Sequence, residues 1–171
     1  MEQLKVVGHY KIEHRNGAGD LFEIIECPNL VTDVGAKLLL DTILAGSSYV
    51  ASTYLGLKGS GSAVVADTQS SHSGWNEVGS ANAPAYSGTR KTISWASASG
   101  SGAGSRSKAS SGTYTFTFTS GGTVDGAFLN INGTTAVDNT TGTLFSVGTF
   151  SGGARTVASA DSLTVTYTLS L

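Results

Sequence analysis

Charged side chains are scarce in this chain of 171 residues. Asp, Glu, Lys and Arg together make up 13% of the sequence, about half of the fraction that is usual in globular domains. Long helices with a charged, solvated face are therefore not expected. The ten basic residues are scattered, and the formal net charge is -2, so the basic patch that binds nucleic acid is missing. We expect no nucleic-acid partner.

Cysteine and long apolar runs are also nearly absent. The single cysteine, Cys27, has no partner for an internal disulfide, and we expect it to be a small buried side chain in a protein made in the cytoplasm. No apolar run reaches the roughly 18 residues of a membrane-spanning helix. The segment from Met1 to Tyr10 lacks the pattern of a signal peptide. The sequence therefore predicts no membrane partner.

What the chain has in abundance is alternation of apolar and hydroxylated residues. From Ser162 to Leu171 every second residue is apolar and the others are Ser or Thr, which is typical of a half-buried β-strand. Thr113–Thr119 has the same period. Further strands are expected at Tyr49–Leu57, Thr89–Trp95, Val124–Ile131 and Thr143–Phe150. Many short strands separated by Gly, Asn, Asp and Ser predict an all-β sandwich or barrel.

The first 31 residues form a charged hairpin in this interpretation. Two strand-like segments, Leu4–Arg15 and Leu21–Val31, flank the sequence Asn16-Gly17-Ala18-Gly19-Asp20, a strong turn signal. Much of the charge of the chain lies in these segments, which distinguishes them from the Thr-rich remainder. We predict an N-terminal hairpin arm over residues 1–31 and a β-sandwich domain over residues 32–171.

One helix and one long loop complete the predicted organisation. A helix is expected at about residues 33–45, with Thr32 or Asp33 as N-cap and Gly46 as its end. Residues 96–112 are mostly Ser, Gly and Ala, with too little apolar surface to order them, and predict a flexible loop. The alternative is a surface loop that becomes ordered on a partner.

The sequence shows no recognisable catalytic, cofactor or metal-binding motif. Nucleophile elbows and phosphate-binding loops are missing. His9 and His14 would point to opposite faces of a strand and His72 lies in a polar segment, so we expect no metal site. The five carboxylates outside the arm and the helix are expected in or near loops as turn and solvation residues: Asp67, Glu77, Asp125, Asp138 and Asp161. We expect no enzyme and no cofactor.

Aromatic residues leave two interpretations open. Trp75, Trp95 and Tyr86 would suit the surface of a sugar-binding site, but aromatic side chains in a β-rich chain are more often part of the core. A glycosidase with two distant carboxylates is the least favoured alternative.

Several short motifs, taken in order, resemble a family of small structural proteins of tailed bacteriophages. They are Tyr54-Leu55-Gly56-Leu57, Ala66-Asp67-Thr68, Trp75-Asn76-Glu77, Ala85-Tyr86-Ser87-Gly88 with Arg90, Val124–Leu129, Gly142–Ser146, Phe150 and Asp161–Thr168. The resemblance runs from about Val31 to Leu171, and Ala160 and the segment 96–112 depart from it. It implies a jelly-roll-like sandwich in the virion, as a capsid decoration (cement) protein on the capsid exterior, synthesised in the host cytoplasm.

The expected partners are the major capsid protein and copies of the chain itself, as a dimer or trimer. The arm is the predicted contact, because it combines apolar side chains with open strand edges. The candidate interface residues are Val6, Val7, Tyr10, Phe22 and Ile24. One alternative is that the arm folds back on its own sandwich. Another is that the protein is a tail or fibre component that binds a host-surface glycan.

Overall fold

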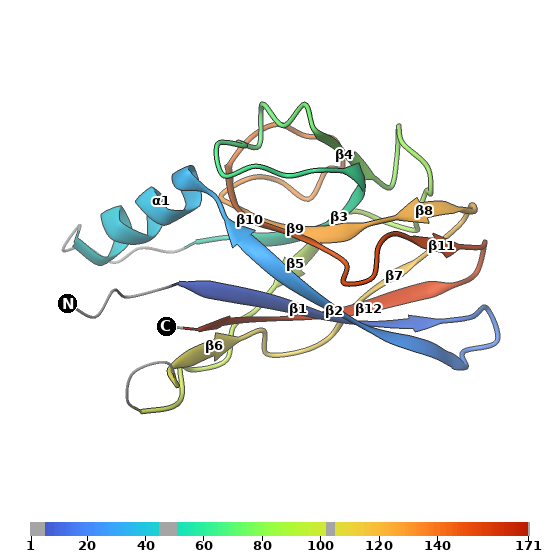
Figure 1. Ribbon diagram of the computed structural model, residues 1–171, viewed down its shortest axis with the longest axis horizontal. Helices are drawn as coiled ribbons and strands as arrows, with labels where there is room; N and C mark the ends of the chain where they lie inside the picture. The colour runs from blue at the N-terminus through green and yellow to red at the C-terminus, as the bar shows by residue number, and fades with distance from the viewer. Residues whose placement is uncertain (1–5, 45–50, 102–104, 171) are drawn as a thin grey trace.

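The computed structural model describes residues 6–44, 51–101 and 105–170, and it is an antiparallel β-sandwich with one short helix (Figure 1). The elements are β1 (Val7–Arg15), β2 (Leu21–Val31), α1 (Asp33–Leu44), β3 (Thr53–Gly61), β4 (Trp75–Val78), β5 (Lys91–Ile93), β6 (Ser107–Ala109), β7 (Tyr114–Thr117), β8 (Gly122–Val124), β9 (Gly126–Ile131), β10 (Thr143–Thr149), β11 (Arg155–Val157) and β12 (Ser162–Ser170). The all-β prediction is therefore confirmed. The jelly-roll connection stays a prediction.

Two layers of strands face each other. In the first, which we call the β1 layer, β1 pairs with β2 and with β12, and β12 pairs in turn with β6 and β7. In the second, the β3 layer, β3 pairs with β4, β5 and β9, and β9 pairs with β10. A small two-stranded sheet joins β8 to β11.

Strand β2 belongs to both layers. Its residues 21–28 pair with β1, whereas Asn29–Val31 pair with β10. Pro28 lies at the change of partner, where its missing N–H interrupts no continuous ladder. The two layers are therefore continuous through one strand, which crosses the centre of Figure 1.

The N-terminal hairpin is part of this sandwich, which corrects the prediction of a separate arm over residues 1–31. Its turn forms as expected, with Asn16 Oδ1 accepting hydrogen bonds from the N–H groups of Ala18 and Asp20 at 3.0 and 2.9 Å, and with Gly19 at φ +90°. Beyond the turn, however, all nine residues of β1 pair with β12. The alternative that the hairpin folds onto its own sandwich is the one the structure shows. Charge was a poor guide because only the outward face of the hairpin carries it.

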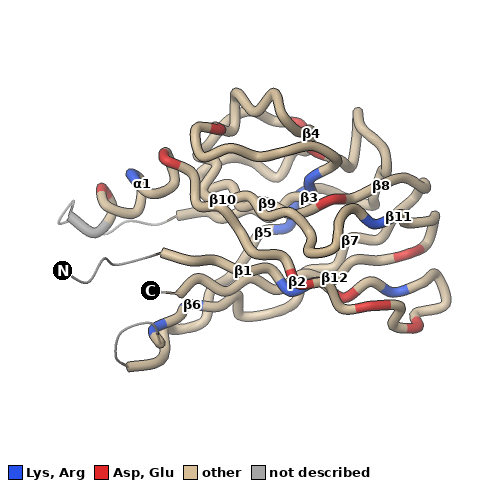
Figure 2. The backbone as a smooth tube through the Cα atoms, in the orientation of Figure 1, with Lys and Arg blue, Asp and Glu red and all other residues tan. Residues whose placement is uncertain are grey.

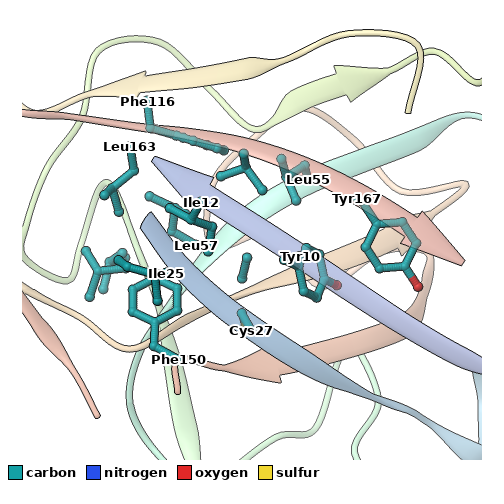
Figure 3. Close-up of a cluster of buried hydrophobic side chains, with 14 of the residues drawn as sticks. Tyr10, Ile12, Ile25, Cys27, Leu55, Leu57, Phe116, Phe150, Leu163 and Tyr167 are labelled. Atoms are coloured by element: carbon teal, nitrogen blue, oxygen red, sulfur yellow. The ribbon is translucent and has the colours of Figure 1, made fainter. Parts of the chain in front are cut away.

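The core lies between the layers and draws side chains from both ends of the chain (Figure 3). Tyr10 and Ile12 from β1, Leu55 from β3 and Leu163 and Tyr167 from β12 have no more than 1% of their surface exposed. The rings of Tyr10 and Tyr167 lie 4.7 Å apart. Cys27 is buried and free, as its isolation in the sequence predicts. The alternation in β12 thus marks the face that enters the core.

Helix α1 begins where the sequence predicts. Thr32 is its N-cap, because Thr32 Oγ1 accepts the N–H of Gly35 at 3.1 Å and the Thr32 carbonyl accepts that of Ala36. Gly35 allows close approach to β10, since a Cβ there would lie 2.2 Å from the Phe145 carbonyl oxygen. The predicted stop at Gly46 lies outside the described residues. Within the described ranges, no helix is long and apolar enough to cross a membrane.

The segment 96–112 differs from the prediction of a flexible loop. Ser107–Ala109 form β6 on the edge of β12, and the N–H of Ser110 donates to the Tyr167 carbonyl at 2.8 Å. Backbone hydrogen bonds therefore order a segment that has little apolar surface to bury. Residues 102–104 lie outside the described residues.

Candidate functional site

Three loops connect strands of the β3 layer. They are residues 62–74 between β3 and β4, 79–90 between β4 and β5, and 132–142 between β9 and β10. Figure 1 shows the loops 62–74 and 132–142 above β3, β9 and β10, whereas 79–90 runs from β4 past β8 to β5. In this loop the N–H of Ser87 donates to the Thr117 carbonyl at 2.8 Å. Beneath the loops lies a second apolar cluster formed by Trp75, Phe128, Leu144 and Val147. We call this assembly the loop layer.

A buried ion pair holds the loop layer together. Arg90 is 1% exposed, and its Nε and Nη2 donate to the two carboxylate oxygens of Glu77 at 2.8 and 2.6 Å. Nη2 also donates to the Asn139 carbonyl at 2.7 Å, and Glu77 Oε2 accepts the N–H of Asp138 at 2.9 Å. Because bidentate pairs of this kind fix geometry as well as charge, Arg90 joins the loops 79–90 and 132–142 to β4. The loop 62–74 is linked to them through Gln69 Nε2, which donates to the Asn139 carbonyl at 3.2 Å.

Burial and the neighbouring Arg90 shift the pKa of Glu77 in opposite directions. Desolvation is the largest effect and raises the pKa of the carboxyl group, while the hydrogen bonds and positive charge of Arg90 lower it. The guanidinium also lies 5.4 Å from the centre of the Phe128 ring. A carboxylate held by three hydrogen bonds in this way positions the loops.

A cavity of about 450 Å³ opens beside this ion pair. Its wall includes Gln69, His72, Trp75, Asn82 and Asp138, which come from all three loops and from β4. The His72 ring stacks on the Trp75 indole at 4.0 Å with an angle of 18° between the planes. The cavity is thus mostly amide and hydroxyl in character, with one flat ring surface.

The aromatic residues proposed for a sugar-binding surface do not form one. Trp75 and Tyr86 are buried, and Trp95 is half-buried. The Trp75 indole N–H donates to Asp67 at 2.9 Å, whereas the Tyr86 ring packs edge-on against Phe116. The core role favoured from the sequence is confirmed for these two residues. Trp75 nonetheless forms part of the cavity wall.

The five carboxylates expected to serve as turn and solvation residues have more specific roles. Asp67, Glu77 and Asp125 are buried, and Asp125 accepts a hydrogen bond from the fully buried Lys58 at 2.8 Å. The exposed Asp138 accepts the N–H of Ala81 at 3.1 Å, and Asp161 accepts that of Ala158 at 2.8 Å. The local contact of Asp161 with Ala158 fits the predicted turn role, whereas the hydrogen bond of Asp138 joins two loops that are 57 positions apart in the chain. Asp67, Glu77 and Asp125 are anchors of the tertiary structure.

The three histidines lie apart from one another. His9 is on the outward face of β1 and pairs with Glu26 at 2.7 Å, whereas His14 is buried, 3.4 Å from Asp161. Their opposite orientations agree with the prediction. No group of three or more potential metal-ligating side chains occurs within the described residues.

The hairpin presents the largest exposed apolar side chain of the described residues. Phe22 is 74% exposed, and Leu21 and Ile24 are about half exposed. Val7 is also exposed and Val6 is half-buried, but Tyr10 is fully buried. Tyr10 is therefore removed from the predicted interface, because its side chain points between the layers. We call Leu21, Phe22 and Ile24 the β2 strip.

One backbone edge of the β2 strip is open. β1 occupies one side of residues 21–28, while β10 reaches the other side only at Asn29–Val31. Between these limits, within the described residues, this side of β2 receives one backbone hydrogen bond, from the N–H of Ser151 to the Glu26 carbonyl at 2.9 Å. Arg155 binds the Glu23 carboxylate beside this edge at 2.7 Å. An open edge with apolar side chains is a surface suited to strand addition.

The geometry defines an antiparallel β-sandwich protein with a cross-linked loop layer on one face and an open apolar strand edge at one end. Comparison of the chain with protein-family models, with curated proteins and with solved structures found no match. Function must therefore be argued from the two surfaces themselves.

Proposed function

We propose that the chain is a virion structural protein, a capsid decoration or cement protein that binds the outer capsid shell of a tailed bacteriophage and stabilises it. The observation that carries this proposal is the β2 strip, an apolar segment on an unpaired strand edge of an otherwise hydroxyl-rich protein. The resemblance of the short motifs to phage structural proteins supports the choice of partner.

The proposed mechanism is the burial of surface. A stable interface of standard size buries about 800 Å² on each partner. Many copies would each bind the major capsid protein through the β2 strip. Each contact is modest, but together they would make the shell resistant to expansion. The chain performs no reaction in this role and needs no cofactor.

Contacts between copies belong to the same proposal. An open edge that pairs with a shell protein in one place is also suited to pair with its own equivalent across a two-fold axis. Pairing across a two-fold axis gives a dimer, whereas a trimer would need the edge to contact a different surface of the next copy. One of these two forms on the capsid exterior, assembled after synthesis in the host cytoplasm, is what we propose.

Particle occupancy tests the proposal directly. Deletion of residues 1–31 is not informative, because it would remove buried residues such as Tyr10 and Ile25 from the core. The double variant Phe22→Ser, Ile24→Thr changes exposed side chains and leaves the core intact. Its occupancy on purified particles should fall by at least about tenfold, as expected when residues that dominate an interface are truncated.

A matched control is available in the loop layer. Val64 and Val65 are also about half exposed but lie outside the β2 strip. The variant Val64→Ser, Val65→Thr should keep full occupancy. Equal occupancy of both double variants would contradict the proposed contact. Mass analysis that counts a few copies per virion, rather than hundreds, would instead place the chain in the tail or fibre.

A further inference from the structure

We propose that the cavity in the loop layer binds a neutral saccharide unit. This site is formed by residues other than those of the β2 strip, so it is independent of attachment to a capsid. The proposal depends on the shape of the cavity, on one buried acceptor without a donor and on the charge of the wall.

The buried acceptor is the side-chain oxygen of Gln69. The side chain is 2% exposed, and its Nε2 donates to the Asn139 carbonyl at 3.2 Å. Because a carbonyl only accepts, this contact fixes which end of the amide is nitrogen. Gln69 Oε1 then has no hydrogen-bond partner. A buried acceptor in this state destabilises the folded protein unless a donor reaches it.

The charge of the wall restricts the class of ligand. Lys and Arg are missing from the residues that line the described cavity, and Glu77 is neutralised by Arg90. Asp138 adds a carboxylate at the rim. Phosphate, sulfate and carboxylate ligands are therefore disfavoured, since nothing in the wall compensates their charge. A wholly apolar ligand would leave the amides of the wall without partners.

A saccharide unit matches both parts of the wall. Its hydroxyl groups can donate to Gln69 Oε1 and accept from the amide of Asn82, while a C–H face can lie on the ring of His72, which Trp75 supports from behind. The volume of about 450 Å³ lies within the roughly 300–1,000 Å³ of small-ligand pockets. Because Gln69 Oε1 is buried in the ligand-free chain, binding requires the Gln69 side chain to turn toward the cavity.

The binding test uses the full chain in solution and NMR spectra of its indole and side-chain amide groups. The probes are glucose, galactose, mannose and N-acetylglucosamine, each as the free sugar and as its α- and β-methyl glycoside. We expect saturable shifts of the Trp75 indole and Gln69 amide signals, with a dissociation constant on the order of millimolar. Binding of a methyl glycoside identifies the end of a glycan as the source, whereas binding of the free sugar alone identifies a free metabolite.

Three variants establish the site. Gln69→Leu removes the acceptor and should weaken binding roughly three- to tenfold, which is the loss of one hydrogen bond. His72→Ala removes the ring surface from a partly exposed position and should weaken binding without unfolding the chain. Asn29→Leu is the matched control, because Asn29 Oδ1 also lacks a partner but lies at β2, away from the cavity. It should bind as the unaltered protein does.

Several results would overturn the saccharide site. They are the absence of saturable shifts with every sugar, equal binding by the Gln69→Leu and His72→Ala variants, or saturation by methylammonium or inorganic phosphate in place of the sugars. None of these results changes the particle occupancy that tests attachment to the capsid, so the two proposals fail separately.

Discussion

The outer faces of the two layers differ in nearly every respect. On the β1 layer the outward residues are threonines, charged side chains and the exposed apolar residues of the β2 strip. Thr115 and Thr164 are examples of the first, with hydroxyls 2.9 Å apart. On the β3 layer the outward face is buried beneath the loop layer and contains Phe128, Lys58 and Asn130 with no exposed surface. Figure 2 shows charged residues both along the hairpin and around these loops.

This difference shows which part of the fold depends on particular side-chain pairs and which part needs only an alternating pattern. The β1 layer needs only alternation, because water solvates one face and the core covers the other. The β3 layer is covered on both faces, so its polar groups must find partners within the protein. The Arg90–Glu77 and Lys58–Asp125 pairs are those partners, and neither lies in a regular pattern along the chain.

Loss of the Arg90–Glu77 ion pair should lower the stability of the folded protein more than any other change considered below. Arg90→Met leaves the Glu77 carboxylate buried without its counter-ion, and we expect a loss of about 3–5 kcal/mol in the free energy of unfolding. Urea titration followed by tryptophan fluorescence measures it. The matched variant Arg15→Met removes an exposed pair with Glu13 and should cost less than about 1 kcal/mol. Similar losses in the two variants would contradict the distinction between a covered and an open face.

Truncation of the second apolar cluster sharpens the same comparison. Leu144→Ala removes a fully buried side chain from the cluster under the loops, and we expect a loss of about 2–5 kcal/mol, as for a residue of the main core. Thr166→Ala on the open face of β12 should change stability by no more than about 0.5 kcal/mol. A Leu144→Ala variant as stable as the unaltered protein would show that the loop layer is not a second core.

Alkaline pH provides the mildest test, since it acts on side chains between the layers. Burial raises the pKa of Tyr167 to about 12 and that of Tyr10 well above its usual value. The unfolded chain releases these protons near pH 10. Burial also raises the pKa of the Cys27 thiol, to about 12. Because the folded state binds more protons than the unfolded chain once these groups ionise there, stability should begin to fall near pH 9 and fall progressively to about pH 12.

Ultraviolet difference spectra at rising pH, with circular dichroism as the measure of folding, check this expectation. The signal of the buried tyrosines should appear together with unfolding. Ionisation of all tyrosines near pH 10 in a folded protein would contradict their burial.

Alternation of apolar and hydroxylated residues predicts strands reliably where one face of the strand is exposed to water. It predicts β12 and β7 closely, and the turn and helix cap follow from local hydrogen bonding. Strands β4, β6 and β11, of three or four residues, are too short to show a period. The expected strand Val124–Ile131 is divided at Asp125, whose N–H donates to the Lys58 carbonyl at 2.8 Å while its carboxylate binds the Lys58 amine. That break depends on a residue 67 positions away.

The candidate cavity could not be predicted from the sequence, because it too depends on contacts between residues that are distant in the chain. Gln69, Asn82 and Asp138 belong to three loops that only the folded β3 layer brings together. The sequence predicts Phe22 and Ile24 of the β2 strip as interface residues but not Leu21, and it places Tyr10 on the wrong face. The two-residue period in β1 separates Tyr10 from its outward neighbours His9 and Lys11, and only the position of the core shows which face is buried.

Because β2 passes from one layer to the other, it determines how the protein would respond to a pulling force. A force applied at the hairpin turn acts along strands that are hydrogen-bonded to β12 on one side and to β10 on the other. Such a pull loads many backbone hydrogen bonds in shear at once instead of peeling them in sequence. A force applied at the hairpin would therefore be carried by the strand pairs of both layers before any one strand separates from the sheet.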